Sequence, residues 1–572
     1  MKIKYIDGKR LSRAIMAGAK RVFQRTDHLN KINFFPVPDA DTGSNISSTF
    51  KSIVNGLNKD SNDRVKTTSK VAADAALLGA HGNSGVIFAQ FFYGVYKEME
   101  DSHVLTTEKF GKAVKNSVHY VYDALSEPKD GTIISVIRDW ANGIYKHRKE
   151  KQDFVELWKH GIEVAQESLE STRERIESRA VEVVDAGAQG FVDFLEGVYK
   201  FISKGKIKEL DSDIERVPDF NVEADDHSAE SLEEINFRYC TEFLIKGENL
   251  NTNQIKVSLE NIGDSIVVAG SDNIARIHVH TNQPSEAMEI VSASAQEIAE
   301  QKVDDMKIEY IDGNTEHGEI ALVTDTACNL PQHIIDKYNI HQIPFNVILK
   351  GTKFLDTFTL SKEHFYKRMN QTEQLSKTSQ PSPALFKKMY KFLLKHYKSV
   401  ISIHLSSPVS GAFQAAQNSA SEFDGKVKVI DSKNLTVAEG LLVEKAAQMI
   451  EKGHDTDTII QQLETDRDNL QLFVSVPDIN TLMKSGRVSK AKGFLAKIFN
   501  IKPILKIDKK GKPVHGDKAF TKAGLPKKLT SLVEKDLEGK KNLKFLIAHA
   551  DAMETAQFYA ELIKKKYNKA RE

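Results

Sequence analysis

Two aspartates stand one residue apart in the segment NFFPVPDADTGSN, where two prolines restrict the backbone that leads to them. Asp39 and Asp41 are hard oxygen donors, and Mg²⁺ is usually held by one or two carboxylates together with phosphate oxygens. The helical pattern that follows offers unpaired N–H groups and a positive dipole end to a phosphate. An Asx turn with a helix cap is the alternative explanation of the pair, so a metal site needs support from other motifs in the sequence.

Three further loops place glycine and polar residues ahead of a helical pattern, and they read GAHGNSG, EPKDGT and DAGAQG. Glycine lets the backbone approach a ligand closely, and each helix start again offers N–H groups. Close packing of helices is the alternative reading of such turns. The sequence contains no GxxxxGK[ST] motif, which excludes a simple P-loop kinase.

A metal-binding site is suggested by two short strand patterns near the middle of the chain. In IARIHVHT, His278 and His280 share one face of the strand, and in FRYCTEFLIK, Cys240 and Glu242 share a face. If these strands are neighbours, a thiolate and two imidazoles could converge on Zn²⁺, with Glu242 or a water as the fourth ligand. The alternative is a pair of histidines on an open sheet face.

A binding site for a carboxylate group is suggested further along the chain, where hydroxyl residues precede two helical patterns. Thr378 and Ser379 lie in KTSQPSPALF, and Ser410 and Gly411 lie in VISIHLSSPVSGAFQAAQ. Helix N–H groups at the carboxyl ends of parallel strands are a usual place for anions. Ordinary N-capping explains each motif singly. Arg487 is a candidate for the positive partner of the carboxylate.

The elements that must position these residues fall into three domains. Helical spacing predicts an all-α domain over 1–204, and the acidic, aperiodic stretch 205–235 predicts a linker. Residues 236–312 predict a small α+β domain, with PSEAMEIVSASAQEIAE as a helix. Residues 318–572 predict an α/β domain with a largely parallel sheet, whose strands are IALV, VISIHL, VKVID, QLFVSV and LKFLIAH.

Composition narrows the class of protein. The 572 residues carry 80 Lys and Arg against 79 Asp and Glu, so no large single-sign field points to a nucleic acid partner. The two cysteines exclude a disulfide framework and fit a reducing compartment. The chain begins without an apolar signal core and has no run of about 18 apolar residues, so we expect a cytoplasmic protein with no transmembrane segment.

The four loop motifs, in this order and spacing, resemble the DhaL-type nucleotide-binding domain of dihydroxyacetone kinases, in the version found in bacterial fatty acid kinases. The resemblance implies an antiparallel helix barrel that binds ATP and Mg²⁺ at one end. It implies that Asp39 and Asp41 are catalytic metal ligands, with Asn33 at a third metal position. Further cofactor-binding residues implied are Thr42, Gly43, Ser44, Asn45, Gly82, Asn83, Ser84, Gly131, Thr132 and Asp185. His81 departs from the arginine usual in fatty acid kinases.

The segments CTEF, GDS and HVHT resemble the middle domain of fatty acid kinases, in which a comparable cluster is associated with zinc. The resemblance implies Cys240, His278 and His280 as zinc ligands. The segments VTDTACNLP, IPFNVIL, TSQPSP, LSSPVSGAFQAA, VIDSKNLT and LMKSGRVSKAKGFLAKIFNIKPIL resemble DegV proteins, the fatty-acid-binding components of fatty acid kinase. That resemblance implies a head group held by Thr378, Ser379 and Ser410, with Gly411 at the helix mouth.

These features together predict an ATP- and Mg²⁺-dependent fatty acid kinase that holds its fatty acid in its own DegV-like domain and yields an acyl phosphate. We expect a homodimer, with separate DegV-type carriers and an acyl-phosphate acceptor enzyme as further partners. Two alternatives remain open. One is a non-catalytic lipid carrier or sensor with a regulatory nucleotide domain, and the other is a kinase of dihydroxyacetone-type hydroxyketones.

Overall fold

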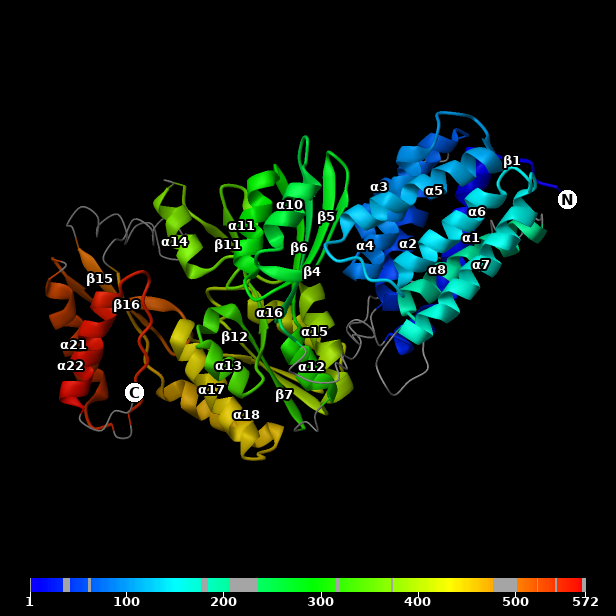
Figure 1. The fold of residues 1–572 in the computed structure, drawn as a ribbon. Helices are drawn as coiled ribbons and strands as arrows, with labels where there is room; N and C mark the ends of the chain where they lie inside the picture. Colours follow the sequence, from blue (N-terminus) through cyan, green and yellow to red (C-terminus); the bar gives the residue numbers. More distant parts are fainter. Residues whose placement is uncertain are drawn as a thin grey trace. The chain divides into compact units, whose positions relative to one another are not determined.

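The computed structural model of the chain describes residues 2–33, 42–59, 63–175, 184–204, 235–314, 319–371, 374–476, 501–521, 523–540 and 543–567. The chain divides into two compact units, Met1–Thr315 and Glu316–Glu572. Figure 1 draws the helices of residues 2–204 in blue to blue-green and the chain from residue 235 onward in green to red. Each unit is described by itself below.

Eight helices of the first unit form a closed ring, because each contacts its neighbour in sequence and the last returns to the first. They are α1 (Gly8–Lys31), α2 (Thr42–Lys59), α3 (Val65–Gly79), α4 (Gly82–Glu98), α5 (Thr107–Ala124), α6 (Ile133–His147), α7 (Phe154–Arg175) and α8 (Ala186–Lys204). A short antiparallel pair, β1 (Tyr5–Ile6) with β2 (Leu105–Thr106), closes one side. The expected helix barrel is confirmed.

The barrel core is aromatic. Ala14, Ile15 and Val22 of α1 face it as the 3.6-residue period predicts, and all are buried. Inside, a cluster of rings packs edge-to-face or stacked around Phe50 of α2, which lies 5.2 Å from the Phe88 ring and 5.0 Å from the Phe194 ring, measured between ring centroids. This rigid interior fixes the helix ends that carry the loops.

The four loops noted in the sequence directly precede α2, α4, α6 and α8. Since consecutive helices joined by short connections run antiparallel, alternate helices point the same way. The N-termini of these four helices therefore lie at one end of the barrel, and their positive dipole ends face the same region.

The remainder of the first unit is a four-stranded antiparallel sheet in the order β4-β5-β3-β6. Its elements are β3 (Tyr239–Lys246), α10 (Thr252–Leu259), β4 (Gly263–Gly270), β5 (Ile274–Thr281), α11 (Pro284–Ser294), β6 (Glu297–Asp305) and α12 (Met306–Asn314). The prediction of one helix over 284–300 is wrong, because the helix ends at Ser294. The residues after it pair with β3 as an edge strand, Ile298 opposite Ile245.

Specific contacts join this sheet to the helical barrel. The Gly270 N–H donates to Gln90 Oε1 of α4 at 3.0 Å, and Val267 and Ala269 enter the core of the barrel. Arg276 is only 1% exposed and donates to the carbonyl oxygen of Leu78 at 2.8 Å. The sheet is thus anchored beside the start of α4, where the second glycine-rich loop lies.

The second unit is built on a parallel sheet in the order β13-β12-β7-β8. Two antiparallel sheets, β10-β9-β11 and β14-β15-β16, accompany it. The strands are β7 (Ile320–Asp325), β8 (His341–Ile343), β9 (Asn346–Leu349), β10 (Thr352–Leu355), β11 (Lys377–Ser379), β12 (Ser399–His404), β13 (Val427–Asp431), β14 (Phe473–Ser475), β15 (Lys502–Ile507) and β16 (Pro513–Ala519). The expected α/β class is confirmed.

Helices flank these strands, and α15, α16 and α17 all contact β12. The helical elements are η2 (Thr326–Cys328), α13 (Gln332–Lys337), α14 (Lys362–Asn370), α15 (Pro383–His396), α16 (Ala412–Ala420), α17 (Thr436–Glu451), α18 (Thr456–Asn469), α21 (Gly524–Leu537) and α22 (Met553–Lys566). Apolar residues of β7, β12 and β13 pack against α17 in one core.

Two strand predictions for this unit need correction. The segment QLFVSV forms β14, but it pairs antiparallel with β15 in a separate sheet and does not extend the parallel one. The segment LKFLIAH, residues 543–549, is not a strand. Leu546 and Ile547 are 37% and 38% exposed, so this apolar run lacks the burial that would hold it in a sheet.

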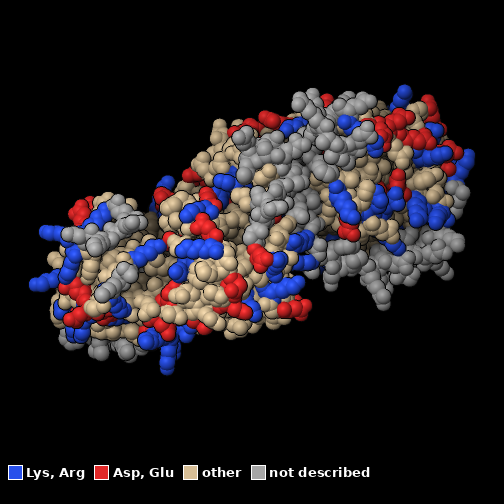
Figure 2. All heavy atoms as spheres, turned by 90° about the horizontal axis from the view of Figure 1, so that it is seen from below, with Lys and Arg blue, Asp and Glu red and all other residues tan. Residues whose placement is uncertain are grey.

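The surface carries both signs of charge. On the face drawn in Figure 2, basic and acidic side chains are interspersed, in keeping with a net charge of +1. No helix among the described residues combines the length and apolar character that crossing a bilayer requires.

Candidate functional site

One pocket of the first unit brings together residues from all four loops and from the antiparallel sheet. Asn33, Asn45, Asn83, Thr132 and Asp185 all line it. The other expected site residues on its wall are Thr42, Gly82, Ser84, Cys240, His278 and His280. Asp39, Asp41 and Arg487 lie outside the described residues. Segments separated by up to about 250 positions in the sequence therefore meet at one end of the barrel.

Gly43 and Ser44 are not among the residues that line this pocket, and their cofactor-binding role stays a prediction. A Cβ at Gly43 would overlap the carbonyl oxygen of Thr26, so this glycine permits α2 to approach α1 closely. Ser44 is tied to Asn30, which accepts from its N–H and donates to its Oγ, both at 3.0 Å. Both residues set the packing of α2, and Asn45 is the neighbour that reaches the pocket.

The second loop makes a left-handed turn at Gly82, and a carboxylate from the sheet holds it there. Gly82 has a φ of +59°, and a Cβ there would overlap the side chain of Asn45, so only glycine fits. Its N–H donates to Glu242 Oε1 at 2.8 Å, and His81 Nδ1 lies 3.0 Å from Glu242 Oε2. Glu242 thus caps the first N–H of α4, a role usually taken by a residue of the helix's own N-terminus.

One residue that lines the pocket beside this loop, Asn83, carries an unsatisfied polar atom. The side-chain oxygen of Asn83 is buried and has no hydrogen-bond partner in the described structure. Ser84 is its neighbour on the wall, and a Cβ at Gly187 would come within 3.0 Å of the Ser84 Oγ. A buried acceptor without a partner costs about 1–3 kcal/mol, which a bound ligand that donates to it would recover.

Asp185 serves two helices at once. Its Oδ1 accepts from the N–H of Ala188 at 2.7 Å and from the N–H of Ile133 at 3.1 Å, so it caps α8 and α6 together. Burial raises the pKa of Asp185 to about 6, although both backbone hydrogen bonds act to lower it. The expected cofactor-binding role is therefore joined by a structural one.

The third loop approaches the pocket through Thr132. Its hydroxyl donates to the carbonyl oxygen of Lys129 at 2.8 Å. Gly131 does not line the pocket, and its φ of +87° is the left-handed turn that lets its N–H reach Ser135 Oγ at 3.0 Å. Gly131 therefore determines the conformation of the loop without lining the pocket.

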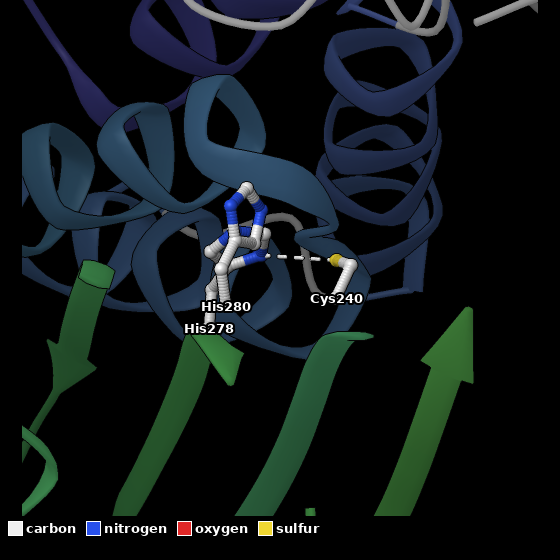
Figure 3. A group of neighbouring side chains, drawn as sticks. All are labelled: Cys240, His278 and His280. Atoms are coloured by element: carbon white, nitrogen blue, oxygen red, sulfur yellow. Dashed lines mark hydrogen bonds between the residues drawn. The ribbon is translucent and has the colours of Figure 1, made fainter. Parts of the chain in front are cut away.

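Cys240, His278 and His280 converge as the strand patterns suggested. Cys240 pairs with His280 across β3 and β5, and Glu242 pairs with His278. One ligand atom from each of the three side chains lies within 4.8 Å of the others, and Figure 3 shows both imidazoles beside the thiol, whose Sγ is 3.8 Å from His278 Nδ1. The hypothesis that β3 and β5 are neighbours is confirmed.

This donor set fits Zn²⁺. Sulfur and imidazole nitrogen are the ligands zinc prefers, and three protein ligands leave a fourth position open. His278 is 3% exposed, and its Nε2 is buried without a partner in the described structure. Carboxylates also lie beside both imidazoles, with Glu242 Oε1 at 3.7 Å from His278 Nδ1 and Asp264 Oδ1 at 3.8 Å from His280 Nδ1. Such carboxylates orient metal-binding histidines in many proteins.

The charged wall residues that the sequence reasoning missed include Lys302 and Asp304, which form an ion pair on β6. Burial would lower the pKa of Lys302, but Asp304, Glu242 and Cys240 raise it well above its ordinary value. Burial would likewise raise the pKa of Glu242, yet Lys302, His278 and His81 hold it well below. The signal lay in the alternation of QKVDD, which the reading of 284–300 as one helix obscured.

The two segments of the expected carboxylate-binding site are neighbours in the second unit. Ser382 is the N-cap of α15 and Gly411 that of α16, as expected, and α15 contacts α16. Gln380, directly after Thr378 and Ser379 of β11, meets Gly411, where a Cβ would overlap its side chain. Thr378 and Ser379 are exposed.

Ser410 lies at the N-terminus of α16. Its Oγ accepts from the N–H of Ala412 at 3.2 Å, which is a local capping contact at the start of α16. The two hydroxyl-bearing segments are thus neighbours through Gln380 and Gly411. These contacts are compatible with capping and with head-group binding alike.

Comparison with known proteins assigns each part of the chain to a family model. The DAK2 domain model matches residues 36–200. A model of the middle domain of fatty-acid-kinase-like proteins matches residues 236–312. The model described as "Uncharacterised protein, DegV family" matches residues 319–572.

Several curated relatives similar in sequence are uncharacterized staphylococcal proteins. One from Staphylococcus saprophyticus is 30% identical over 334 residues, which is 56% of this chain and 60% of that protein. One from Staphylococcus epidermidis is 32% identical over 293 residues, 50% of this chain and 52% of that protein. The chain thus spans between about half and three fifths of the length of these relatives.

Solved structures of DegV proteins are similar to part of the chain. A fatty acid binding protein from Bacillus subtilis is 30% identical, covers 44% of this chain and 90% of its own, and gives a TM-score of 0.41. A DegV family protein from Thermus thermophilus is 26% identical, covers 42% and 88%, and gives 0.39. By the three family models, the chain carries, in this order, a DAK2 region, a fatty-acid-kinase-like middle region and a DegV region.

Proposed function

We propose that this protein is an ATP- and Mg²⁺-dependent fatty acid kinase, with the fatty acid held by its DegV region. The observation that carries the proposal is the pocket in which the N-termini of α2, α4, α6 and α8 meet beside the Cys240, His278 and His280 cluster. Four helix dipoles whose positive ends face one pocket favour a polyphosphate. The match of residues 236–312 to the middle domain of fatty-acid-kinase-like proteins supports the acceptor class.

The chemistry asks little of the side chains. A fatty acid carboxyl group has a pKa near 4, so its oxygen is already a nucleophile at neutral pH and no proton has to be removed. That oxygen forms a bond to the γ-phosphorus of ATP, the bond from phosphorus to the β-γ bridging oxygen breaks, and ADP leaves with acyl phosphate as the other product. Alignment and charge neutralisation are then the main requirements.

We assign Mg²⁺ and Zn²⁺ to different sets of ligands. Mg²⁺ would neutralise phosphate charge, held by Asp39 and Asp41 with Asn33 at a third position. Asn33 is buried and lines the pocket, as this role requires. Zn²⁺ would be held by Cys240, His278 and His280. The proposal also retains a homodimer, separate DegV-type carriers and an acyl-phosphate acceptor enzyme as partners.

Two measurements on the purified protein test this proposal against its rivals. Mass spectrometry of extracted lipid identifies any bound fatty acid, and ATP consumption is followed with fatty acid, with dihydroxyacetone and with neither. We expect turnover that depends on the fatty acid. Turnover that depends on dihydroxyacetone would favour a hydroxyketone kinase. Bound lipid without any turnover would favour a carrier or sensor.

A further inference from the structure

Glu242 touches both the candidate metal cluster and the glycine-rich loop at the start of α4. It lies on β3 two residues after Cys240, so both side chains project from the same face of the strand. Its side chain is 2% exposed, and it makes contacts in two directions. One carboxylate therefore connects two regions that belong to different family models.

Toward the barrel, Glu242 fixes backbone. It accepts the Gly82 N–H at 2.8 Å and lies 3.0 Å from His81 Nδ1. Gly82 carries the positive φ that turns the chain into α4, and its position also sets the room left for Asn45. The next residue, Asn83, lines the pocket and carries a buried oxygen that has no partner in the described structure. A shift of Glu242 would therefore move residues on the nucleotide side.

Toward the sheet, Glu242 faces His278. Its Oε1 lies 3.7 Å from His278 Nδ1, and the same imidazole is 3.8 Å from Cys240 Sγ. A metal ion bound by this cluster would fix the orientation of the His278 ring, and with it the position of the carboxylate beside that ring. The positive charge of Lys302 also acts on Glu242 and lowers the pKa of its carboxyl group.

We infer that Glu242 is a positioning residue that transmits occupation of the Cys240, His278 and His280 cluster to the loop 79–85 and so to nucleotide affinity. This inference rests on the proposed function, which makes that loop part of a nucleotide pocket. Metal binding orders Glu242, Glu242 holds the Gly82 N–H, and the loop is preorganised for the nucleotide. Because linkage is reciprocal, nucleotide must raise metal affinity by the same factor.

The first test uses the full-length protein without nucleotide. Amide hydrogen exchange of the peptide that covers 79–85 is compared after removal of metal by chelation and after reloading with zinc chloride. We expect about tenfold slower exchange at Gly82 in the zinc-loaded wild type, which is within the usual range of such couplings. In Glu242→Ala, the response to zinc should disappear. Glu242→Gln keeps one acceptor for the Gly82 N–H and should recover part of it.

A matched control lies in the same sheet. Glu297 pairs with Lys246 on the surface and touches neither the cluster nor the loop, so Glu297→Ala should respond to zinc like the wild type. Zinc content is measured in every variant at saturating zinc chloride, because loss of Glu242 is expected to weaken metal binding about 10- to 100-fold. If Glu242→Ala does not fold, Glu242→Gln is used instead, and we expect zinc to slow exchange at 79–85 less in this variant than in the wild type.

The second test measures binding of ADP to the zinc-loaded and zinc-stripped forms. We expect about tenfold tighter binding to the loaded wild type and equal binding to both forms of Glu242→Ala. The inference is overturned if zinc leaves exchange at 79–85 unchanged in the wild type, or if Glu242→Ala keeps the full response. Failure of ADP to bind, with the exchange response present, would contradict the proposed function instead.

Discussion

Cys240 contributes the one sulfur of the candidate zinc cluster, and the chain offers a control for it. Replacement of Cys240 by Ala removes the thiolate, so bound zinc should fall from about one ion per chain to nearly none. Cys328 is buried in the core of the second unit and is not part of that cluster, so Cys328→Ala should keep its zinc. Metal analysis of the two purified variants checks this, and equal zinc contents would contradict the assignment of Cys240.

Asp185 makes the stability of the barrel depend on pH. Its pKa is raised from 3.8 to about 6 by burial, so the folded form binds the proton more tightly than the unfolded chain. The stabilisation from that proton is fully present below pH 4 and is lost as the pH rises through about 6, which amounts to on the order of 3 kcal/mol. Asp185→Asn keeps the acceptor oxygen and removes this titration.

Urea unfolding followed by tryptophan fluorescence measures this effect, because both tryptophans, Trp140 and Trp158, lie in the barrel. Between pH 4 and pH 7 the wild type should lose stability relative to Asp185→Asn. Parallel pH profiles for the two proteins would show that the carboxyl group titrates in the folded barrel as it does in the unfolded chain.

At the scale of elements, the start of α4 depends on one backbone conformation. Gly82→Ala puts a Cβ against Asn45 and forces a φ of +59° on a residue that resists it, which costs about 1–2 kcal/mol. We expect ADP affinity to fall about tenfold or more. Gly425 has a φ of +76° with open space around it, so Gly425→Ala carries similar strain and should leave ADP affinity unchanged.

Calorimetric titration with ADP compares these two glycine variants with the wild type. An unchanged affinity in Gly82→Ala would mean that the start of α4 does not shape the nucleotide pocket. An equal loss in Gly425→Ala would mean that backbone strain acts through general destabilisation.

The sequence predicted the helices and the four loops well, because an apolar face that repeats every 3.6 residues has few alternatives. It did not distinguish glycines that approach a ligand from glycines that approach another helix. Gly43 and Gly82 stand in similar loops, yet one packs α2 on α1 and the other lines the pocket. That difference depends on which helices are neighbours, which is a property of the tertiary fold.

The metal cluster was predicted only as far as strand pairing could be assumed. Alternation placed His278 with His280 and Cys240 with Glu242, and the register of β3 against β5 then joined them. Lys302 and Asp304 could not be found in the same way, because β6 directly follows α11 and its sequence continues a helical pattern. The contact of Glu242 with Gly82 joins positions 160 apart, which no local pattern reports.

At the scale of the whole molecule, one polypeptide carries a proposed kinase unit and a proposed fatty acid carrier. Linking two such units raises their effective concentration to about millimolar when the linker permits docking. Fatty-acid-dependent turnover should then change little when the protein is diluted well below the affinity of separate proteins for each other. A rate per enzyme that falls in proportion to protein concentration would indicate that transfer occurs between chains.

The most direct measurement of the central claim is ATP consumption by the full chain with and without fatty acid, compared between the wild type and the Asp39→Asn, Asp41→Asn double variant. We predict that the wild type consumes ATP only with fatty acid and that the double variant loses at least about 100-fold of this rate while it still binds fatty acid, because the metal that neutralises the phosphates is no longer held. Undiminished fatty-acid-dependent turnover in the double variant would contradict the account.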